Sequence, residues 1–120
     1  MKKYQTLLVI SLVCLFSSCV QKAYKKTIVI KLTVHHIKGI KTVGIRGNGD
    51  PLSWDKDFPL QTVVKDSLYT LTSTVITGYK FAEIKFAVNG EFELKDKPNR
   101  RLVFSDTDTT NYNAVFDVNQ

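Results

Sequence analysis

Alternation of apolar and polar residues along the chain predicts β-strands. Between residues 27 and 35 the even positions are apolar and mostly β-branched, while polar residues occupy most of the odd ones. A period of two residues is the pattern of a strand with one buried face. We therefore expect these apolar positions to face a core: Ile28, Ile30, Leu32 and Val34.

Segments with this alternation occur along the rest of the chain, and clusters of Gly, Pro, Asn and Asp separate them. No stretch after residue 27 shows the helical period. About seven short strands with regular turn signals predict an all-β fold, an immunoglobulin-like antiparallel β-sandwich. The further predicted strands are 43–47, 67–76, 81–88, 91–95, 101–105 and 112–118.

One turn is sharp enough to predict a register. Asn89-Gly90 is a strong hairpin signal, because both residues tolerate the positive φ angles of a two-residue turn. If residue 88 pairs with 91, then 87 lies opposite 92, 86 opposite 93 and 85 opposite 94. We expect one face to be buried, with Ile84, Phe86 and Val88. The other face, nearer to solvent, would carry a lysine beside an aromatic ring: Lys85, Ala87, Phe92 and Leu94.

The chain begins with a leader pattern. Two lysines precede an apolar run over residues 7–16, which is too short to span a bilayer, since a span needs about 20 residues. The segment 15–19, Leu-Phe-Ser-Ser-Cys, resembles the lipobox of bacterial lipoproteins, which implies acylation of Cys19 as the mature N-terminus. An ordinary cleaved signal, with Cys19 a free thiol, is the alternative. We predict a signal peptide over 1–18, a lipidated tether over 19–26 and the sandwich over 27–120.

Length and charge narrow the classes of function. The 120 residues are enough for one domain, and 43% hydrophobic with 23% charged residues is ordinary for a packed protein. Cleavage before Cys19 would leave 102 residues, and 15 basic against 11 acidic residues give a formal charge of +4. That charge does not indicate nucleic-acid binding. Cys14 leaves with the signal and Cys19 carries lipid, so the domain would contain no thiol for a disulfide or a zinc site.

Catalytic patterns are sparse. His35 and His36 are adjacent in a predicted strand, so we expect them on opposite faces, unable to hold a metal together. Asp50, Asp55 and Asp57 cluster in one loop, and we expect them to be solvated rather than placed in a cleft that raises a pKa. We predict no enzyme activity, no cofactor and no metal site.

Three separated segments carry a family resemblance. They are Gly44-Ile45-Arg46-Gly47-Asn48 running on to Trp54-Asp55 and Leu60, then Glu83-Ile84-Lys85-Phe86 with the hairpin up to Phe92, and Lys97-Pro98-Asn99-Arg100. In this order they resemble the starch-binding modules of carbohydrate-binding family 20 and the glycogen-binding domains of family 48. The resemblance covers roughly residues 27 to 118.

The resemblance implies one glucan site. Trp54 stands at the first aromatic platform, Lys85 at the family's lysine, and Asn99 at a polar contact. Phe92, or alternatively Leu94, stands where the family has its second tryptophan. The Tyr of the family's second site is missing. Each residue has a structural alternative: Trp54 as a buried loop anchor, Lys85 as a solvated strand residue, Phe92 as packing, Asn99 as a turn residue, and Arg46 as the partner of Asp50 or Asp55.

The resulting hypothesis is a non-catalytic, membrane-anchored lipoprotein that binds α-glucan-like polysaccharide or oligosaccharide. Its predicted location is the cell envelope, at the outer membrane of a Gram-negative bacterium. The alternative function is an interaction module for another envelope protein, which keeps the fold without sugar binding and pairs through an edge strand or through the Phe92/Leu94 face.

Overall fold

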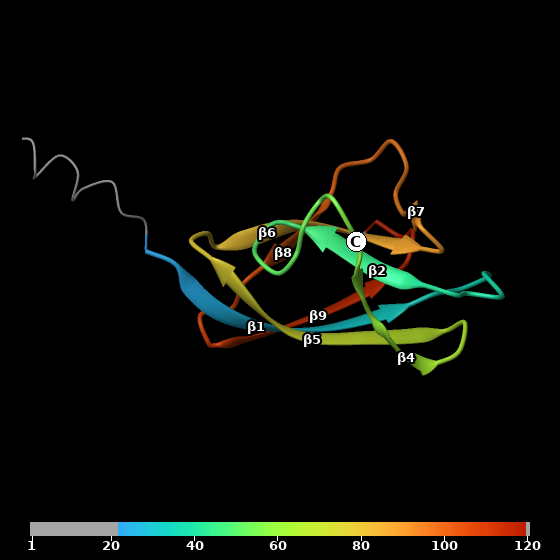
Figure 1. The fold of residues 1–120 in the computed structure, drawn as a ribbon, viewed down its shortest axis with the longest axis horizontal. Coiled ribbons are helices and arrows are strands. Elements are labelled where there is room, and N and C mark those ends of the chain that lie inside the picture. Colours follow the sequence, from blue (N-terminus) through green and yellow to red (C-terminus); the bar gives the residue numbers. More distant parts are fainter. Residues whose placement is uncertain (1–21, 120) are drawn as a thin grey trace, which may run out of the picture.

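Two β-sheets pack face to face in the computed structural model, which describes residues 22–119 (Figure 1). The predicted signal peptide and Cys19 lie outside these residues. The first sheet has the order β4 (Gln61–Val64), β5 (Leu68–Thr77), β1 (Tyr24–Thr33), β9 (Thr109–Val115). The second has the order β3 (Phe58–Pro59), β2 (Val43–Gly47), β6 (Phe81–Val88), with β7 (Glu91–Phe92) and β8 (Arg100–Val103) both pairing with β6.

The predicted all-β sandwich is confirmed, with two differences in detail. β1 and β9 pair in parallel, so the described sheets are not wholly antiparallel. The segment 58–64 forms two short strands, β3 and β4, that were not predicted. It leaves the second sheet and joins the first, and the buried Leu60 lies between the two strands. The immunoglobulin-like type of connectivity stays a prediction.

The core lies between the sheets and is built by the predicted alternation. Ile28, Ile30, Leu32 and Val34 are almost fully buried, as expected from their spacing. From the second sheet, Ile84, Phe86 and Val88 face them and are also buried. Burial of a side chain of this size contributes about 1.5–3 kcal/mol. The burial of these side chains is therefore a main source of the domain's stability.

The hairpin register is confirmed for its first two rungs, is kept in part at the third, and is wrong at the fourth, which was to place Leu94 opposite Lys85. Asn89 and Gly90 take φ angles of 52° and 81°, Val88 pairs with Glu91, and Ala87 pairs with Phe92. β7 then ends, although the amide of Glu93 still donates to the carbonyl of Phe86 at 3.0 Å. Leu94 takes a φ of 51° and is buried, so it does not share an open face with Phe92.

A carboxylate fixes the loop that follows β1. The side chain of Asp66 accepts hydrogen bonds from the amide of Ile40 at 2.9 Å and from the amide of Gly39 at 3.2 Å. The hydrogen bond from Ile40 lowers the pKa of Asp66 below its ordinary value of 3.8, and desolvation acts in the opposite direction. The hydrogen bond from Gly39 and the charges of Lys65 and Lys38 lower the pKa further. Asp66 thereby connects the 34–42 segment to the β4–β5 turn.

This carboxylate predicts an acid-dependent loosening of the loop. Because the pKa of Asp66 is lower in the folded chain than in the unfolded chain, its contribution to stability is complete above the ordinary value and is lost as the pH falls through the lowered pKa. Amide exchange of Gly39 and Ile40 should therefore accelerate below about pH 3.8 beyond the intrinsic trend, as followed by NMR. Asp66→Asn keeps an acceptor but does not titrate, so the same acid transition in that variant would contradict the assignment.

Candidate functional site

The candidate site lies on the outer face of the second sheet, away from the core. Arg46 of β2 is directly opposite Lys85 of β6, and Ala87 is opposite both Gly44 and Phe92. Residues on this face alternate with the buried side chains of the same strands. Figure 1 shows the β2–β3 segment and the β7–β8 segment both rising on this side of the sheet. The face is therefore bordered by two loops.

Arg46 connects the parts of this face. Its Nε donates to the Asp57 carboxylate at 2.7 Å, and its Nη1 donates to the carbonyl of Trp54 at 2.9 Å. Its guanidinium carbon lies 4.9 Å from the centre of the Phe92 ring. The expected pairing of Arg46 with Asp50 or Asp55 is wrong, and the partner is Asp57.

The close approach of Asp57 depends on a glycine. A Cβ atom at position 44 would lie 2.6 Å from the Cβ of Asp57, nearer than side-chain carbons pack. Glycine at this position therefore leaves room for the Asp57 side chain against β2. The same contact holds the β2–β3 loop, which also carries Trp54, against β2.

Trp54 is half-buried, between the two alternatives of an exposed platform and a buried anchor. Its indole N–H donates to the side-chain oxygen of Asn48 at 2.7 Å. The amide of Asp55 donates to the hydroxyl of Ser53 at 3.0 Å, which tightens the turn around the ring. The polar atom of the indole thus has a protein partner, and the remaining exposed part of the ring is apolar.

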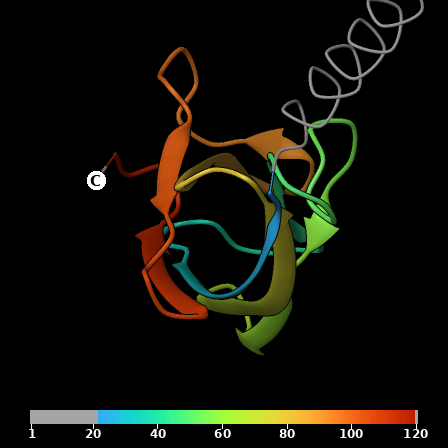
Figure 2. The same cartoon turned by 90° about the vertical axis from the view of Figure 1, so that its left-hand side faces the viewer.

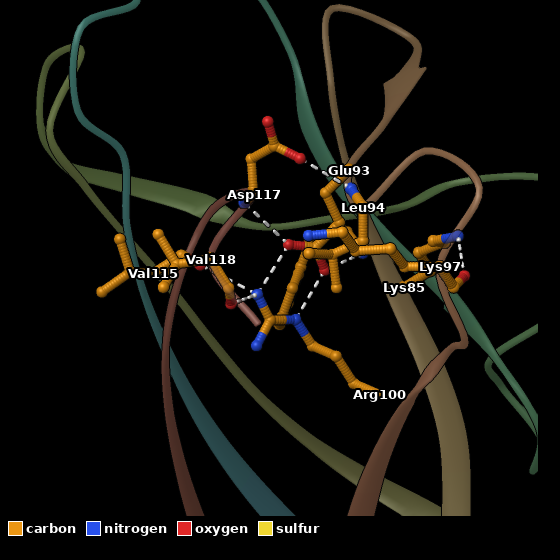
Figure 3. A network of polar contacts seen from close by, with 9 residues as sticks. Lys85, Glu93, Leu94, Lys97, Arg100, Val115, Asp117 and Val118 are labelled. Atoms are coloured by element: carbon orange, nitrogen blue, oxygen red, sulfur yellow. Dashed lines mark hydrogen bonds and ion pairs between the residues drawn. The ribbon is translucent and has the colours of Figure 1, made fainter. Parts of the chain in front are cut away.

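Lys85 and Asn99 lie toward the other border. Lys85 is half-buried, and its ammonium group donates to the carbonyl of Lys97 at 3.3 Å (Figure 3). Asn99 is exposed, and its amide donates to the carboxylate of Glu83 at 3.4 Å. Glu83 stands two residues before Lys85, on the same face of β6. Arg46 therefore contacts the Phe92 ring and the backbone of Trp54, and Lys85 lies opposite it on β6, while Asn99 reaches the face through Glu83.

The loop that carries Asn99 is fixed by a buried ion pair that the sequence analysis missed. Arg100 donates to the Glu93 carboxylate through Nε at 2.7 Å and through Nη2 at 2.8 Å. The two side chains are 3% and 0% exposed. Figure 3 shows this pair, and Glu93 also accepts from the amide of Phe86 at 3.0 Å. A signal was available: the hairpin register puts residue 93 opposite Phe86, on the buried face, where a carboxylate needs a partner.

The ion pair also holds the end of the chain after β9. Arg100 Nη2 donates to the carbonyls of Val115 at 2.8 Å and Val118 at 2.9 Å, and Glu93 accepts from the amide of Asp117 at 3.0 Å. Burial opposes the charge of Arg100, but the hydrogen bonds and the charge of Glu93 outweigh it and raise the pKa of Arg100. The guanidinium stays charged at any physiological pH.

The two histidines do not behave as expected from an extended strand. β1 ends at Thr33, and His36 takes a φ of 63°. The rings of His35 and His36 consequently lie 6.1 Å apart, centre to centre, rather than on opposite faces. Within residues 22–119, no three His, Cys, Asp or Glu side chains gather closely enough to hold a metal ion.

Comparison with known proteins adds no family assignment. No protein-family model matches the chain, and no curated protein matches it. In the part of the chain that the structure describes, no helix has the length and apolar character to cross a membrane. The resemblance to starch- and glycogen-binding modules therefore rests on the residues of this chain alone.

Proposed function

We propose that this domain binds an α-glucan-like polysaccharide or oligosaccharide on the outer face of the second sheet, without catalysis. The observation that carries the proposal is that Arg46 joins the Phe92 ring, the Trp54 backbone and, across the strand pair, Lys85 on one side of the second sheet. Aromatic faces offer flat apolar area to the C–H surface of pyranose rings, and ammonium and amide groups bond hydroxyls. The face combines both kinds of group.

The carboxylates of this face support a binding role rather than glycoside hydrolysis. Asp57 is held by Arg46 at 2.7 Å, and Glu83 accepts from Asn99 at 3.4 Å. Hydrolysis needs a pair of carboxyl groups on either side of the scissile bond, one of them with a raised pKa. Carboxylates engaged with cationic or amide partners do not fit that requirement.

A lipid on Cys19 would hold the domain at the membrane of the cell envelope. Each buried methylene contributes about 0.8 kcal/mol, so several acyl chains anchor stably while one is marginal. The mechanism would be tethering: the anchored domain concentrates glucan at the membrane or presents it to a partner protein. We propose no nucleic-acid ligand and no cofactor.

The test is affinity electrophoresis of the full-length chain, in mild neutral detergent, through gels with and without soluble starch or glycogen. The wild type should be retarded by glucan, and Trp54→Ala should lose the retardation, because it removes one of the two aromatic platforms of the proposed site. Tyr24→Ala removes an exposed aromatic ring from the other sheet and should leave the retardation unchanged. Unchanged mobility of the folded wild type would contradict α-glucan binding.

A second candidate function, pairing with another envelope protein, is favoured by the edge strand β4. All four residues of β4 are exposed, and Val63 and Val64 are 56% and 52% exposed. An open edge with apolar side chains is a template for pairing with another strand. The Phe92/Leu94 face is not available for this role, because Leu94 is buried. Failure of the glucan test would leave the β4 edge as the surface to examine.

A further inference from the structure

One end of the sandwich gathers apolar side chains that the core leaves uncovered. Nine large apolar side chains of the described residues are exposed, and five of them lie in three segments, 22–26, 76–81 and 103–108. These segments are the entry into β1, the region of the β5–β6 turn, and the β8–β9 turn; we call them together the entry end, which faces the viewer in Figure 2. The five side chains are Tyr24, Ile76, Tyr79, Phe81 and Val103.

Backbone and side-chain contacts hold the three segments together. Tyr24 pairs with Thr77 at the end of β5. The ammonium group of Lys26 donates to the carbonyls of Ser105 and Thr107, each at 3.1 Å. The amide of Phe104 donates to the carbonyl of Lys80 at 2.9 Å. The entry end is thus one continuous surface rather than three separate loops.

Tyr79 is the most prominent side chain of this surface. It is 70% exposed and lies between two hollows that it lines together with Gly78. One hollow, of about 540 Å³, is also lined by Ile76 and Phe81. The other hollow, of about 470 Å³, is also lined by Tyr24 and Val103. A tyrosine ring this exposed, beside two hollows with both apolar and polar linings, is suited to the interface between water and the acyl chains of a bilayer.

The charges of the entry end are mainly positive. The three segments contain four lysines, at 22, 25, 26 and 80, and two carboxylates, Asp106 and Asp108, a formal excess of two positive charges. Glu83 borders the first hollow. The ammonium group of Lys22 lies 5.7 Å from the centre of the Tyr24 ring. Tyrosine rings beside lysines are the side chains that favour the boundary between lipid headgroups and acyl chains.

The position of the entry end in the chain indicates that a lipid bilayer is its partner. The described residues begin at Lys22, and Cys19 stands only three residues earlier. Three extended residues span at most about 10 Å. A bilayer that holds a lipid on Cys19 therefore lies within that distance of Lys22, and the entry end is the part of the domain nearest to it.

We propose that the entry end contacts the lipid bilayer directly, with Tyr24 and Tyr79 in the headgroup region and the surrounding lysines at anionic headgroups. This inference rests on the lipid anchor of the proposed function, but not on glucan binding. Such a contact would fix the orientation of the sandwich on the membrane. The outer face with Arg46 and Lys85 extends along the sheet away from this end, and Glu83 and Asn48 lie where the two surfaces adjoin.

The proposal is tested by the depth of a single tryptophan in vesicles. The full-length chain is reconstituted into vesicles of phosphatidylcholine and phosphatidylglycerol, part of which carries brominated acyl chains that quench tryptophan fluorescence. Trp54→Phe removes the native fluorophore, and Tyr79→Trp places one at the entry end. The matched control combines Trp54→Phe with Val63→Trp, which places the fluorophore on β4, a strand outside the entry end with a comparably exposed side chain.

Quenching at position 79 should be several-fold stronger than at position 63, and Phe81→Ser together with Tyr24→Ser should reduce it without unfolding the chain, as checked by circular dichroism. Equal quenching at both positions would overturn the proposal. Failure of the chain to float with vesicles would overturn it as well, because no anchor would then exist. Glucan retardation uses a different readout, so its failure leaves this result standing.

Discussion

Replacing Arg100 with alanine should lower the free energy of unfolding by about 3–5 kcal/mol, because it leaves a buried carboxylate without its counter-ion. The carboxylate is that of Glu93, whose side chain is 0% exposed. The same substitution removes the donors to the carbonyls of Val115 and Val118. Since small domains are stabilised by about 5–15 kcal/mol in total, a large part of the margin depends on this one side chain.

The neighbouring arginine is the matched control. Arg101 also lies on β8, but its side chain is exposed, and its guanidinium carbon lies 4.2 Å from the centre of the Phe81 ring. Arg101→Ala should therefore change the free energy of unfolding by about 1 kcal/mol or less. Urea unfolding followed by circular dichroism measures both variants. Equal losses would show that the buried pair contributes no more than a surface contact.

The conformation of the β7–β8 loop depends on the same ion pair, Glu93 with Arg100. Glu93 and Arg100 stand at its two ends, and between them the carbonyl of Lys97 accepts from Lys85. The loop is thus closed at its base by a buried ion pair and connected to the outer face by a half-buried lysine. The position of Asn99 beside Glu83 depends on that closure.

Local patterns predicted those parts of the fold that depend on local causes. The alternation in β1 and β6 follows from burial of one face of a strand, and the structure buries Ile28, Ile30, Ile84 and Phe86 accordingly. Asn89-Gly90 predicted a register because a two-residue turn fixes its own first rungs. These inferences needed no knowledge of distant residues.

The remainder depends on partners that are far apart in the sequence. β3 and β4 are too short to show a period, and the parallel pairing of β1 with β9 has no local signature. The Leu94 prediction failed because Leu94 takes a φ of 51° and its amide donates to the side chain of Asp117, a residue far along the chain. The candidate site also combines local and distant causes. Trp54 and Lys85 could be predicted from local motifs, whereas the central position of Arg46 comes from the pairing of β2 with β6.

Arg46→Met should abolish the glucan retardation as completely as Trp54→Ala, although Arg46 was not singled out as a sugar contact. Methionine keeps much of the volume but removes the donors to Asp57 and to the carbonyl of Trp54. The β2–β3 loop then loses the side-chain bonds that hold Trp54 and Asp57 to β2, and Phe92 loses the cation over its ring. Affinity electrophoresis beside the wild type and Trp54→Ala measures the effect.

Stability separates loss of positioning from loss of folding. The side chains of Arg46 and Asp57 are 27% and 31% exposed, so solvent screens the pair and Arg46→Met should cost about 1 kcal/mol or less of unfolding free energy. Arg46→Lys keeps the charge but cannot serve Asp57 and Trp54 through one planar fork, so partial retardation is expected. Arg101→Met is the control for loss of an exposed arginine and should bind normally. Full retardation of a folded Arg46→Met chain would show that Trp54 acts without the Arg46 contacts, and that the convergence on this face is structural.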